Sequence, residues 1–301
     1  MFSTPILFLI FNREDTTRQV FEAIRQQKPK YLYVASDGPR RGKDGEKDRC
    51  RKTREIINGV DWDCELRTLF RDENLGCRDA VSSAITWFFE NVEQGIILED
   101  DCLPDSSFFP YCEELLERYK DDERVGCVSG NCFFPNYVTP GVSYDFSSIV
   151  HIWGWASWRR VWKNFDVNFP FWKENRHNKT AINNLFNSQR EKIYFSSFLA
   201  DTLSGKKSIS AWDVQYFYLL RLQNQLSVYP AVNLVTNIGL NSEGATHTKK
   251  NNNKVFRSSL SMRFPLKHPS DMLRNKKLDE VTIKENFFSW KRLLRYYIGD
   301  Y

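Results

Sequence analysis

The sequence predicts an α/β protein built on a mainly parallel central sheet. Apolar runs alternate with amphipathic segments over the first hundred residues, an order that is typical of parallel strands connected by helices. Hydrophobic residues make up 41% of the 301 positions, enough to bury a large core in one domain or in two closely joined halves. Acidic side chains follow two of the predicted strands, where sheets of this kind bind ligands.

The elements follow one another in a regular order through residue 98. Apolar runs predict strands at 5–11, 30–36, 64–71 and 95–98, and amphipathic segments predict helices at 17–27, in a charged stretch through residue 56, and at 76–92. Thr16 or Thr17 can cap the first of these helices through its hydroxyl group. Asp37 and the acidic group at 99–101 both come directly after a predicted strand.

The second part of the chain is less regular. Helices are predicted at 106–120 and 210–223, a strand at 125–130, and a tryptophan-rich turn leading into a helix at 152–162. Trp153 or Trp155 on this turn could form an apolar platform for a sugar face, with core packing as the alternative. Polar composition predicts a mobile linker near residue 250, and the segment 284–301 predicts an amphipathic helix.

Composition narrows the class of protein. The net charge is +5, with 43 basic residues against 38 acidic ones, which permits an anionic ligand without indicating a nucleic-acid scaffold. The seven cysteines are irregularly spaced and predict free thiols in a reducing compartment. The apolar stretch at the start of the sequence is too short to span a bilayer and lacks the features of a signal peptide. We therefore expect a cytoplasmic protein.

Three consecutive carboxylates, Glu99, Asp100 and Asp101, follow the buried run 95–98. Like charges this close repel each other, and a divalent cation such as Mg²⁺ or Mn²⁺ would offset the repulsion, because hard cations prefer carboxylate oxygens. Such an ion usually shares its coordination shell with substrate phosphates. The alternative is a solvated acidic turn. The apolar residues on both sides of the triplet favour the metal.

Five further side chains are candidates for the same site. Asp37 could accept hydrogen bonds from a nucleobase or ribose, although Asp-Gly is also an ordinary turn. Arg13 could hold a phosphate, and Arg78 at a helix start could face a diphosphate. His247 is a plausible second metal ligand beside the carboxylates. Asp213 at a helix start is either a cap or a general base that deprotonates an acceptor hydroxyl.

Four separated motifs also carry a resemblance to a known family. They are "NLGCRDAVSSAITWFFENVEQGIILEDDCLP", "WGWASWRRVW", "SAWDVQYF" and "NIGLNSEGATHT". In this order, over about residues 4–250, they resemble bacterial glycosyltransferases of the GT-A fold, and more distantly the N-acetylglucosaminyltransferase I type. The resemblance implies a GT-A domain at 1–250 and a basic tail at 251–301. In that domain, a Rossmann-like nucleotide-sugar-binding half (1–101), with a mixed central sheet flanked by helices, is fused to an acceptor-binding half (102–250).

The resemblance also implies residue roles. Asp101 would hold the divalent metal, and His247 lies in a motif that matches a loop closing over the diphosphate. Glu99 and Asp100 would face the sugar and ribose of the donor, Asp37 the nucleobase, and Arg13 the donor. Asp213 occupies the position of the catalytic base in inverting members. The tail after residue 250 and the acceptor half depart from the family pattern, so the acceptor does not carry over.

We therefore expect a metal-dependent, inverting glycosyltransferase that extends a bacterial surface polysaccharide. Its donor would be a nucleotide-sugar, with a UDP-sugar favoured, and its acceptor a glycan or lipid-linked glycan hydroxyl. We also hypothesise that the tail helix touches the inner face of the membrane, with docking on the domain as the alternative. One rival is a sugar nucleotidyltransferase. Such an enzyme would normally carry a glycine-rich, basic loop near its N-terminus, and the segment "FNREDTTRQ" does not contain one. The other is a non-catalytic carbohydrate-binding protein.

Overall fold

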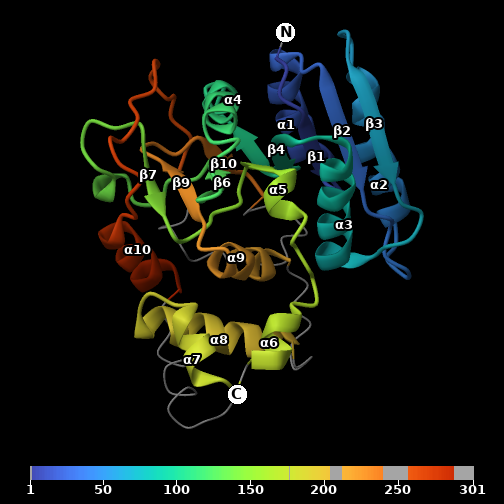
Figure 1. Cartoon of the computed structure of the whole chain (residues 1–301). Coiled ribbons are helices and arrows are strands. Elements are labelled where there is room, and N and C mark those ends of the chain that lie inside the picture. The colour runs from blue at the N-terminus through green and yellow to red at the C-terminus, as the bar shows by residue number, and fades with distance from the viewer. Residues whose placement is uncertain (1, 176, 204–211, 240–256, 288–301) are drawn as a thin grey trace.

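The centre of the protein is a mixed sheet with helices packed around it (Figure 1). In this computed structural model, residues 2–175, 177–203, 212–239 and 257–287 are described. Among these residues eight strands form the main sheet, in the order β3-β2-β1-β4-β8-β6-β9-β7. The predicted α/β class, with a mixed central sheet flanked by helices, is confirmed.

The first half of the sheet is parallel, as predicted. Its strands are β1 (Ile6–Ile10), β2 (Tyr31–Ser36), β3 (Glu65–Phe70) and β4 (Gln94–Glu99). Every residue of β1 is buried, as expected for an apolar strand covered on both faces. The chain moves outward from β1 to β2 and β3, and then returns to place β4 on the other side of β1. This reversal of strand order is the point at which Rossmann-like sheets open a ligand crevice.

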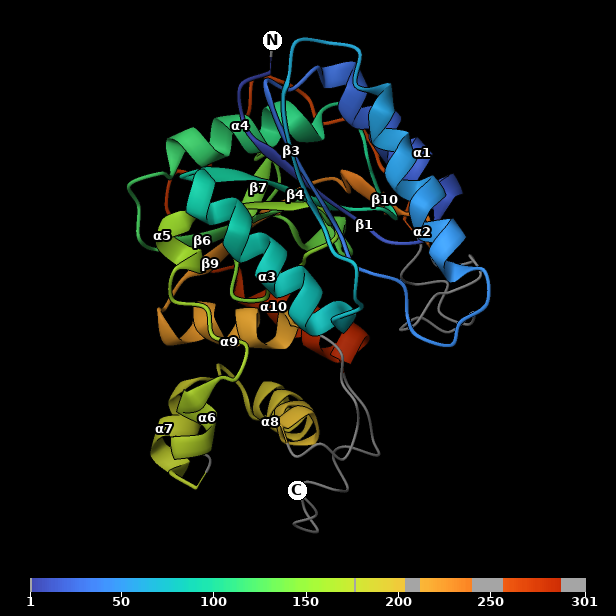
Figure 2. The same ribbon diagram turned by 90° about the vertical axis from the view of Figure 1, so that its right-hand side faces the viewer.

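Three main helices connect these strands: α1 (Glu14–Gln27), α2 (Glu46–Glu55) and α3 (Gly76–Asn91). A short 3₁₀ turn, η1 (Ile56–Gly59), follows α2. Helices α1 and α2 lie side by side on one face of the sheet, and α3 lies on the opposite face (Figure 2). All three helices were predicted.

The predicted cap of the first helix is wrong. The helix begins at Glu14, so Thr16 and Thr17 lie inside it, and their hydroxyls donate to the backbone carbonyl of Arg13. Glu14 and Asp15 stand in the first turn, where negative charge is favourable beside the helix N-terminus. The helix therefore starts earlier than the threonines suggest.

The second half supplies the remaining strands. They are β5 (Cys102–Pro104), β6 (Val125–Ser129), β7 (Tyr144–Ser147), β8 (Trp155–Trp158), β9 (Leu226–Pro230) and β10 (Val235–Asn237). Strand β8 lies antiparallel between β4 and β6, so the predicted tryptophan-rich turn is in part a central strand. Strands β5 and β10 form a separate antiparallel pair.

Successive side chains of β8 point to opposite faces of the sheet, and they therefore contact different helices. Trp155 packs on α9 (Asp213–Leu222) through Trp212 and Tyr216, whereas the Trp158 indole donates to the carbonyl of Leu116 in α4 (Phe108–Arg118). Helices α9 and α4 thus cover opposite faces of the sheet. Trp155 is 0% exposed and cannot form a sugar platform, because its ring is buried against Trp212 and Tyr216.

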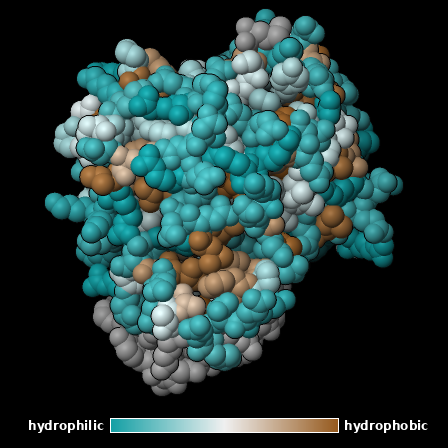
Figure 3. Space-filling model, viewed as in Figure 1, coloured by the Kyte–Doolittle hydropathy of each residue, from teal (hydrophilic) through white to brown (hydrophobic). Residues whose placement is uncertain are grey.

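Helix α9 lies between the sheet and a small helical group, α6 (Pro170–Asn175), α7 (Lys179–Asn184) and α8 (Gln189–Leu203) (Figure 1). Tyr216 and Leu220 belong to the main core, while Val214, Phe217 and Tyr218 belong to a second apolar cluster with α6 to α8. The surface of this side is mostly hydrophilic, with apolar side chains gathered in the hollow over α9 (Figure 3). Both long faces of α9 are therefore packed.

Part of the segment predicted as a tail packs on the domain. Met262 and Leu266 are buried in the main core, and α10 (Lys276–Thr282) with the following π-turn η3 (Ile283–Phe287) continues this packing. The rest of the predicted amphipathic helix lies outside the described residues. Within the described ranges, no helix is long and apolar enough to cross a membrane. The short elements α5 (Arg159–Trp162) and η2 (Pro135–Tyr137) complete the fold.

Candidate active site

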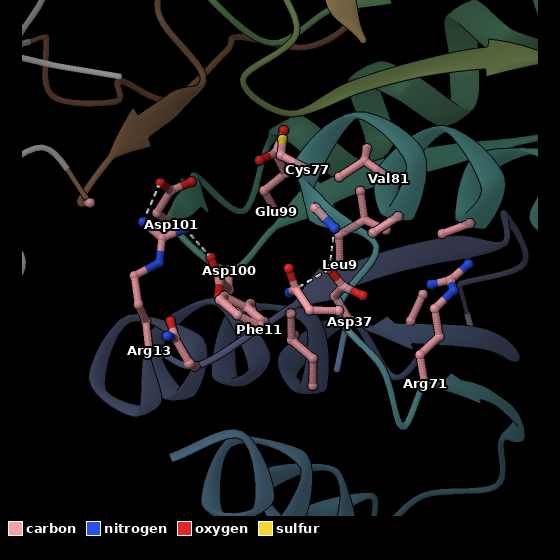
Figure 4. Close-up of a pocket in the computed structure, with 18 of the residues that line it drawn as sticks. Leu9, Phe11, Arg13, Asp37, Arg71, Cys77, Val81, Glu99, Asp100 and Asp101 are labelled. Carbon is pink, nitrogen blue, oxygen red and sulfur yellow. Dashed lines mark hydrogen bonds and ion pairs between the residues drawn. The ribbon is translucent and has the colours of Figure 1, made fainter. Parts of the chain in front are cut away.

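The carboxyl ends of β1, β2 and β4 open into a cavity of about 440 Å³ (Figure 4). This position is the reversal point of the strand order, and the volume lies within the range of small-molecule sites, roughly 300–1,000 Å³. One wall is apolar and is formed by Leu9, Ala35, Ala80, Val81 and Ala84. Polar side chains line the rest, namely Asn12, Arg13, Asp37, Arg40, Arg71, Asn74, Glu99, Asp100, Asp101 and Asn237.

Arg13 pairs with two of the three predicted acids. Its guanidinium donates to Asp100 Oδ1 through one terminal nitrogen and to Asp101 Oδ2 through the other, the latter at 2.7 Å. The second oxygen of Asp100 accepts from the backbone N–H of Phe11 at 3.1 Å. The register of β1 and β4 places Leu9 opposite Glu99, which brings the residues after both strands together. Arg13 thus lies at the site as predicted, with its terminal nitrogens on carboxylates.

Glu99 faces a different part of the cavity, toward Cys77 (Figure 4). Burial raises the pKa of Glu99 to about 8, and repulsion from Asp101 and Asp100 adds to the effect, while Arg13 opposes it. Cys77 also lines the cavity, and partial desolvation and the negative charge of Glu99 raise the pKa of its thiol. The raised pKa of Glu99 reflects the cost of placing a third negative charge beside Asp101 and Asp100 in a buried place.

Strand β10 closes one side of the triplet. The backbone N–H of Ile238 donates to the Asp101 carbonyl at 2.8 Å, and Asn237 pairs with Cys102 across the β5–β10 ladder. At Gly239 an added Cβ would lie 2.4 Å from Asp101 Oδ2 and 2.6 Å from an Arg13 terminal nitrogen. Only glycine fits there, because the backbone packs directly on the ion pair.

A divalent cation fits the donor set and the charge of this site. Three carboxylates and one guanidinium leave two negative charges when all three acids are ionised, and hard cations prefer such oxygens. Asp101 Oδ1 contacts the Cys102 thiol at 3.5 Å, whereas Oδ2 is held by Arg13. In the described part of the chain, no three His, Cys, Asp or Glu side chains are arranged as a complete metal site. A cation would therefore be held through Asp101 and would complete its shell from a bound ligand.

Asp37 lies at the cavity, and its carboxylate holds the turn that precedes α3. Oδ1 accepts from the backbone N–H groups of Gly38 and Leu75, both at 2.9 Å. Oδ2 accepts from the Asn74 amide at 2.8 Å and from the Gly76 N–H at 3.0 Å. Four donors satisfy the carboxylate, so any contact with a nucleobase competes with the turn. The structure thus gives Asp37 a shaping role that the sequence did not predict.

A second ionic group shapes the cavity and was missed from the sequence. Glu46 is 0% exposed and accepts from the Asn12 amide at 2.9 Å and from the Arg40 backbone N–H at 2.7 Å. Its carboxylate also pairs with the Arg40 guanidinium, whose hydrogen bonds lower the pKa of Glu46. Asn12 and Arg40 both line the cavity. Glu46 lies in a highly charged stretch, where it could not be distinguished from a solvated acid.

Asp213 begins α9, and its Oδ1 accepts from the Val214 N–H at 3.0 Å. The carboxylate is close enough to the site to add to the repulsion that raises the pKa of Glu99 and of Cys77. The structure thus brings Asp213 toward the acidic triplet from the other half of the chain. Trp153, from the loop before β8, also lines the cavity and packs edge-on against Phe133.

Three predicted site residues are not among those that line the cavity in the described part of the chain, and Asp213 is one of them. Arg78 pairs with Asp79 at 3.0 Å and is not one of the side chains that line the cavity in the described part of the chain. Arg71 lines it instead and donates to the Ser83 hydroxyl at 2.9 Å. The predicted metal ligand His247 lies outside the described residues.

Comparison with known proteins finds weak structural likenesses only. A cytidylyltransferase from Leptospira borgpetersenii serovar Hardjo-bovis is 14% identical with a TM-score of 0.34, over 59% of this chain and 73% of that chain. Mouse xyloside xylosyltransferase 1 in its apo form is 10% identical with a TM-score of 0.36, over 74% and 83%. HddC from Yersinia pseudotuberculosis is 9% identical with a TM-score of 0.32, over 55% and 80%. No protein-family model and no curated protein matches the chain.

Proposed function

We propose that this protein is a GT-A glycosyltransferase that moves a sugar from a nucleoside-diphosphate sugar to a hydroxyl group of a glycan acceptor. The observation that carries the proposal is the pair of opposed acidic groups. The triplet at the end of β4 lines the cavity at the strand-order reversal. Asp213 begins α9, and the preceding Trp212 stacks on Trp155 of β8, the strand that pairs with β4. Leaving-group stabilisation and acceptor activation need charges on opposite sides of the reacting sugar.

The cavity suits a nucleotide-sugar donor. The apolar wall around Leu9, Ala35 and Val81 offers a slot for a flat base, and the turn held by Asp37 forms its rim. Arg13 and the acidic triplet stand at the other end, where the diphosphate and sugar would lie. A bound Mn²⁺ or Mg²⁺, with Asp101 as its protein ligand, would neutralise the charge that develops on the diphosphate. A UDP-sugar is the proposed donor.

Asp213 is the proposed general base. Its carboxylate would accept the proton of the acceptor hydroxyl as that oxygen forms a bond to the anomeric carbon. The bond from the anomeric carbon to the diphosphate oxygen breaks in the same step, and its electron pair leaves with the diphosphate. One displacement inverts the anomeric configuration. Trp153, the remaining platform candidate, would contact the apolar face of a sugar at the cavity mouth.

A sugar nucleotidyltransferase is the second candidate. Three arginines, Arg13, Arg40 and Arg71, line the same cavity, and a nucleoside triphosphate brings more negative charge to it than a diphosphate does. In that reaction a sugar phosphate attacks the triphosphate and releases pyrophosphate. Asp213 would then have no acceptor hydroxyl to deprotonate.

A donor screen tests both candidates. The protein is incubated with Mn²⁺ and each of a set of nucleotide-sugars without acceptor, and free nucleoside diphosphate is measured together with the shift in melting temperature. Slow hydrolysis of one donor, reduced in Asp213→Asn, supports the glycosyltransferase. Parallel reactions contain nucleoside triphosphates and sugar 1-phosphates. Release of pyrophosphate there, without hydrolysis of any nucleotide-sugar, would replace the first proposal with the second.

A further inference from the structure

Arg13 pairs with both aspartates of the acidic triplet. One terminal nitrogen holds Asp100, and the other holds Asp101 Oδ2 at 2.7 Å. Asp100 is almost fully buried, with 4% of its side chain exposed, and its remaining oxygen is taken by the Phe11 N–H. Asp101 is therefore the more available of the two aspartates, and it offers one oxygen, Oδ1, to a ligand.

The surroundings hold this ion pair in place. Gly239 packs against both Asp101 Oδ2 and Arg13, leaving no room for a Cβ between them. The Ile238 N–H fixes the Asp101 backbone, and the Arg13 carbonyl accepts from the Thr17 N–H at 3.1 Å, which ties the Arg13 backbone to the first turn of α1. A guanidinium bridging two carboxylates in a partly buried place forms strong, charge-assisted hydrogen bonds. A cation that approaches Asp101 is repelled by this positively charged guanidinium and competes with it for Oδ2.

We propose that Arg13 is a positioning residue that weakens divalent-cation binding as long as no nucleotide is bound. Its guanidinium occupies Asp101 Oδ2, so Asp101 can bind a cation through both oxygens only after Arg13 releases it. Phosphate oxygens of an entering diphosphate are alternative acceptors for the same N–H groups. Arg13 would then move from carboxylate to phosphate, and the cation and the nucleotide would bind together. The inference rests on the proposed use of the triplet as a metal site.

Direct binding of Mn²⁺ tests this role without any nucleotide or turnover. Free Mn²⁺ is measured by electron paramagnetic resonance while MnCl₂ is titrated into wild-type protein and into Arg13→Gln. Loss of the rival charge and release of Asp101 Oδ2 should tighten Mn²⁺ binding by about tenfold or more. Arg18→Gln is the matched control, because it removes the same charge from an exposed position on α1, where Arg18 pairs with Glu14. It should bind like the wild type.

Arg13→Lys is the second variant, in case Arg13→Gln does not fold. It keeps the charge, but an ammonium group lacks the planar fork with which the guanidinium spans both carboxylates, so its Mn²⁺ affinity should lie above that of the wild type. Unchanged or weaker Mn²⁺ binding in a folded Arg13 variant overturns the inference, as does equal tightening in Arg18→Gln. These outcomes are independent of the donor screen, which measures nucleotide-sugar hydrolysis and is made on the wild type and Asp213→Asn.

Discussion

The indole rings of Trp155 and Trp212 stack with their centroids 5.7 Å apart and their planes at 26°. Trp155 belongs to central strand β8, and Trp212 directly precedes Asp213 at the start of α9. The Tyr216 ring also packs on Trp155, and its hydroxyl donates to the Gly126 carbonyl at 3.0 Å. The first turn of α9 is thus fixed to the sheet, and the Asp213 carboxylate is positioned by the core.

Asp213→Asn should lower turnover by about a hundredfold or more while leaving donor affinity nearly unchanged. The amide cannot accept a proton at neutral pH, but its oxygen can still accept the hydrogen bond from the Val214 N–H, so the start of α9 should be preserved. Steady-state kinetics and donor calorimetry provide the two measurements. Asp121→Asn, at an exposed carboxylate, is the control and should retain full activity. Full activity in Asp213→Asn would remove it from the mechanism.

The product of the same reaction should have the anomeric configuration opposite to that of the donor. A single base acting on the acceptor implies one displacement, and one displacement inverts the reacting carbon. Proton NMR of the first-formed product reads the anomeric coupling before mutarotation interferes. A product with the donor's configuration would contradict a single displacement. It would indicate either two displacements at the anomeric carbon or a reaction that does not attack this carbon.

Asp101→Ala should abolish the part of donor binding that depends on Mn²⁺, whereas Asp213→Asn should keep it. Two oxygens of Asp100 and one of Asp101 accept hydrogen bonds from Arg13 or from the Phe11 N–H. Among the hydrogen bonds of the described residues, Asp101 Oδ1 accepts from neither and contacts the Cys102 thiol instead. In the proposed mechanism Asp213 acts on the acceptor. Calorimetric titrations of the donor with and without Mn²⁺, made on both variants, separate the two roles. Equal losses in the two variants would contradict this division.

Asp37→Ala should destabilise the protein by about 2–4 kcal/mol, because the substitution leaves four donors without their acceptor, three of them in the turn before α3. Donor affinity should fall as well, since this turn forms a rim of the cavity. Urea unfolding and donor calorimetry measure the two effects. Asp72→Ala, an exposed acid in the same turn, is the control and should change neither. A stable Asp37→Ala protein with weak donor binding would instead indicate direct contact with the base.

Glu46 should stabilise the protein in a pH-dependent way. Hydrogen bonds from Arg40 lower its pKa below the ordinary value of 4.5, so the folded protein binds this proton less readily than the unfolded chain. The contribution is therefore present above about pH 4.5 and is lost as the pH falls through the lower, folded-state pKa. Urea unfolding should show Glu46→Gln to be less stable than wild type at neutral pH, with the difference shrinking in acid. A difference that is constant with pH would contradict the assignment.

The parallel half of the fold could be predicted because its signals are local. Strands β1, β2 and β4 are apolar runs of five or six residues, and the helices between them have clear apolar faces. Strand β8 could not be predicted in the same way. Its four residues contain no periodic pattern, and its partner β4 lies some sixty residues earlier in the chain.

The sequence predicted which residues line the site better than it predicted what those residues contact. The sequence places Arg13, Asp37 and the acidic triplet after strands, and all of them line one cavity. Their partners depend on tertiary register. Arg13 meets Asp100 and Asp101 because β1 and β4 are paired as they are, and the donors to Asp37 come from a turn nearly forty residues away. No local pattern of the sequence contains that information.

The insertion of β8 beside β4 has a consequence for how the protein is made. Strand β4 ends at residue 99, but the strand that covers its outer edge is complete only when residue 158 has been synthesised. Until then the nascent chain presents an apolar strand with unpaired backbone groups, a state open to pairing with other chains. A fragment that stops after the acidic triplet would keep this edge permanently. A fragment of residues 1–101 should therefore aggregate when produced alone and become soluble only when β8 is supplied.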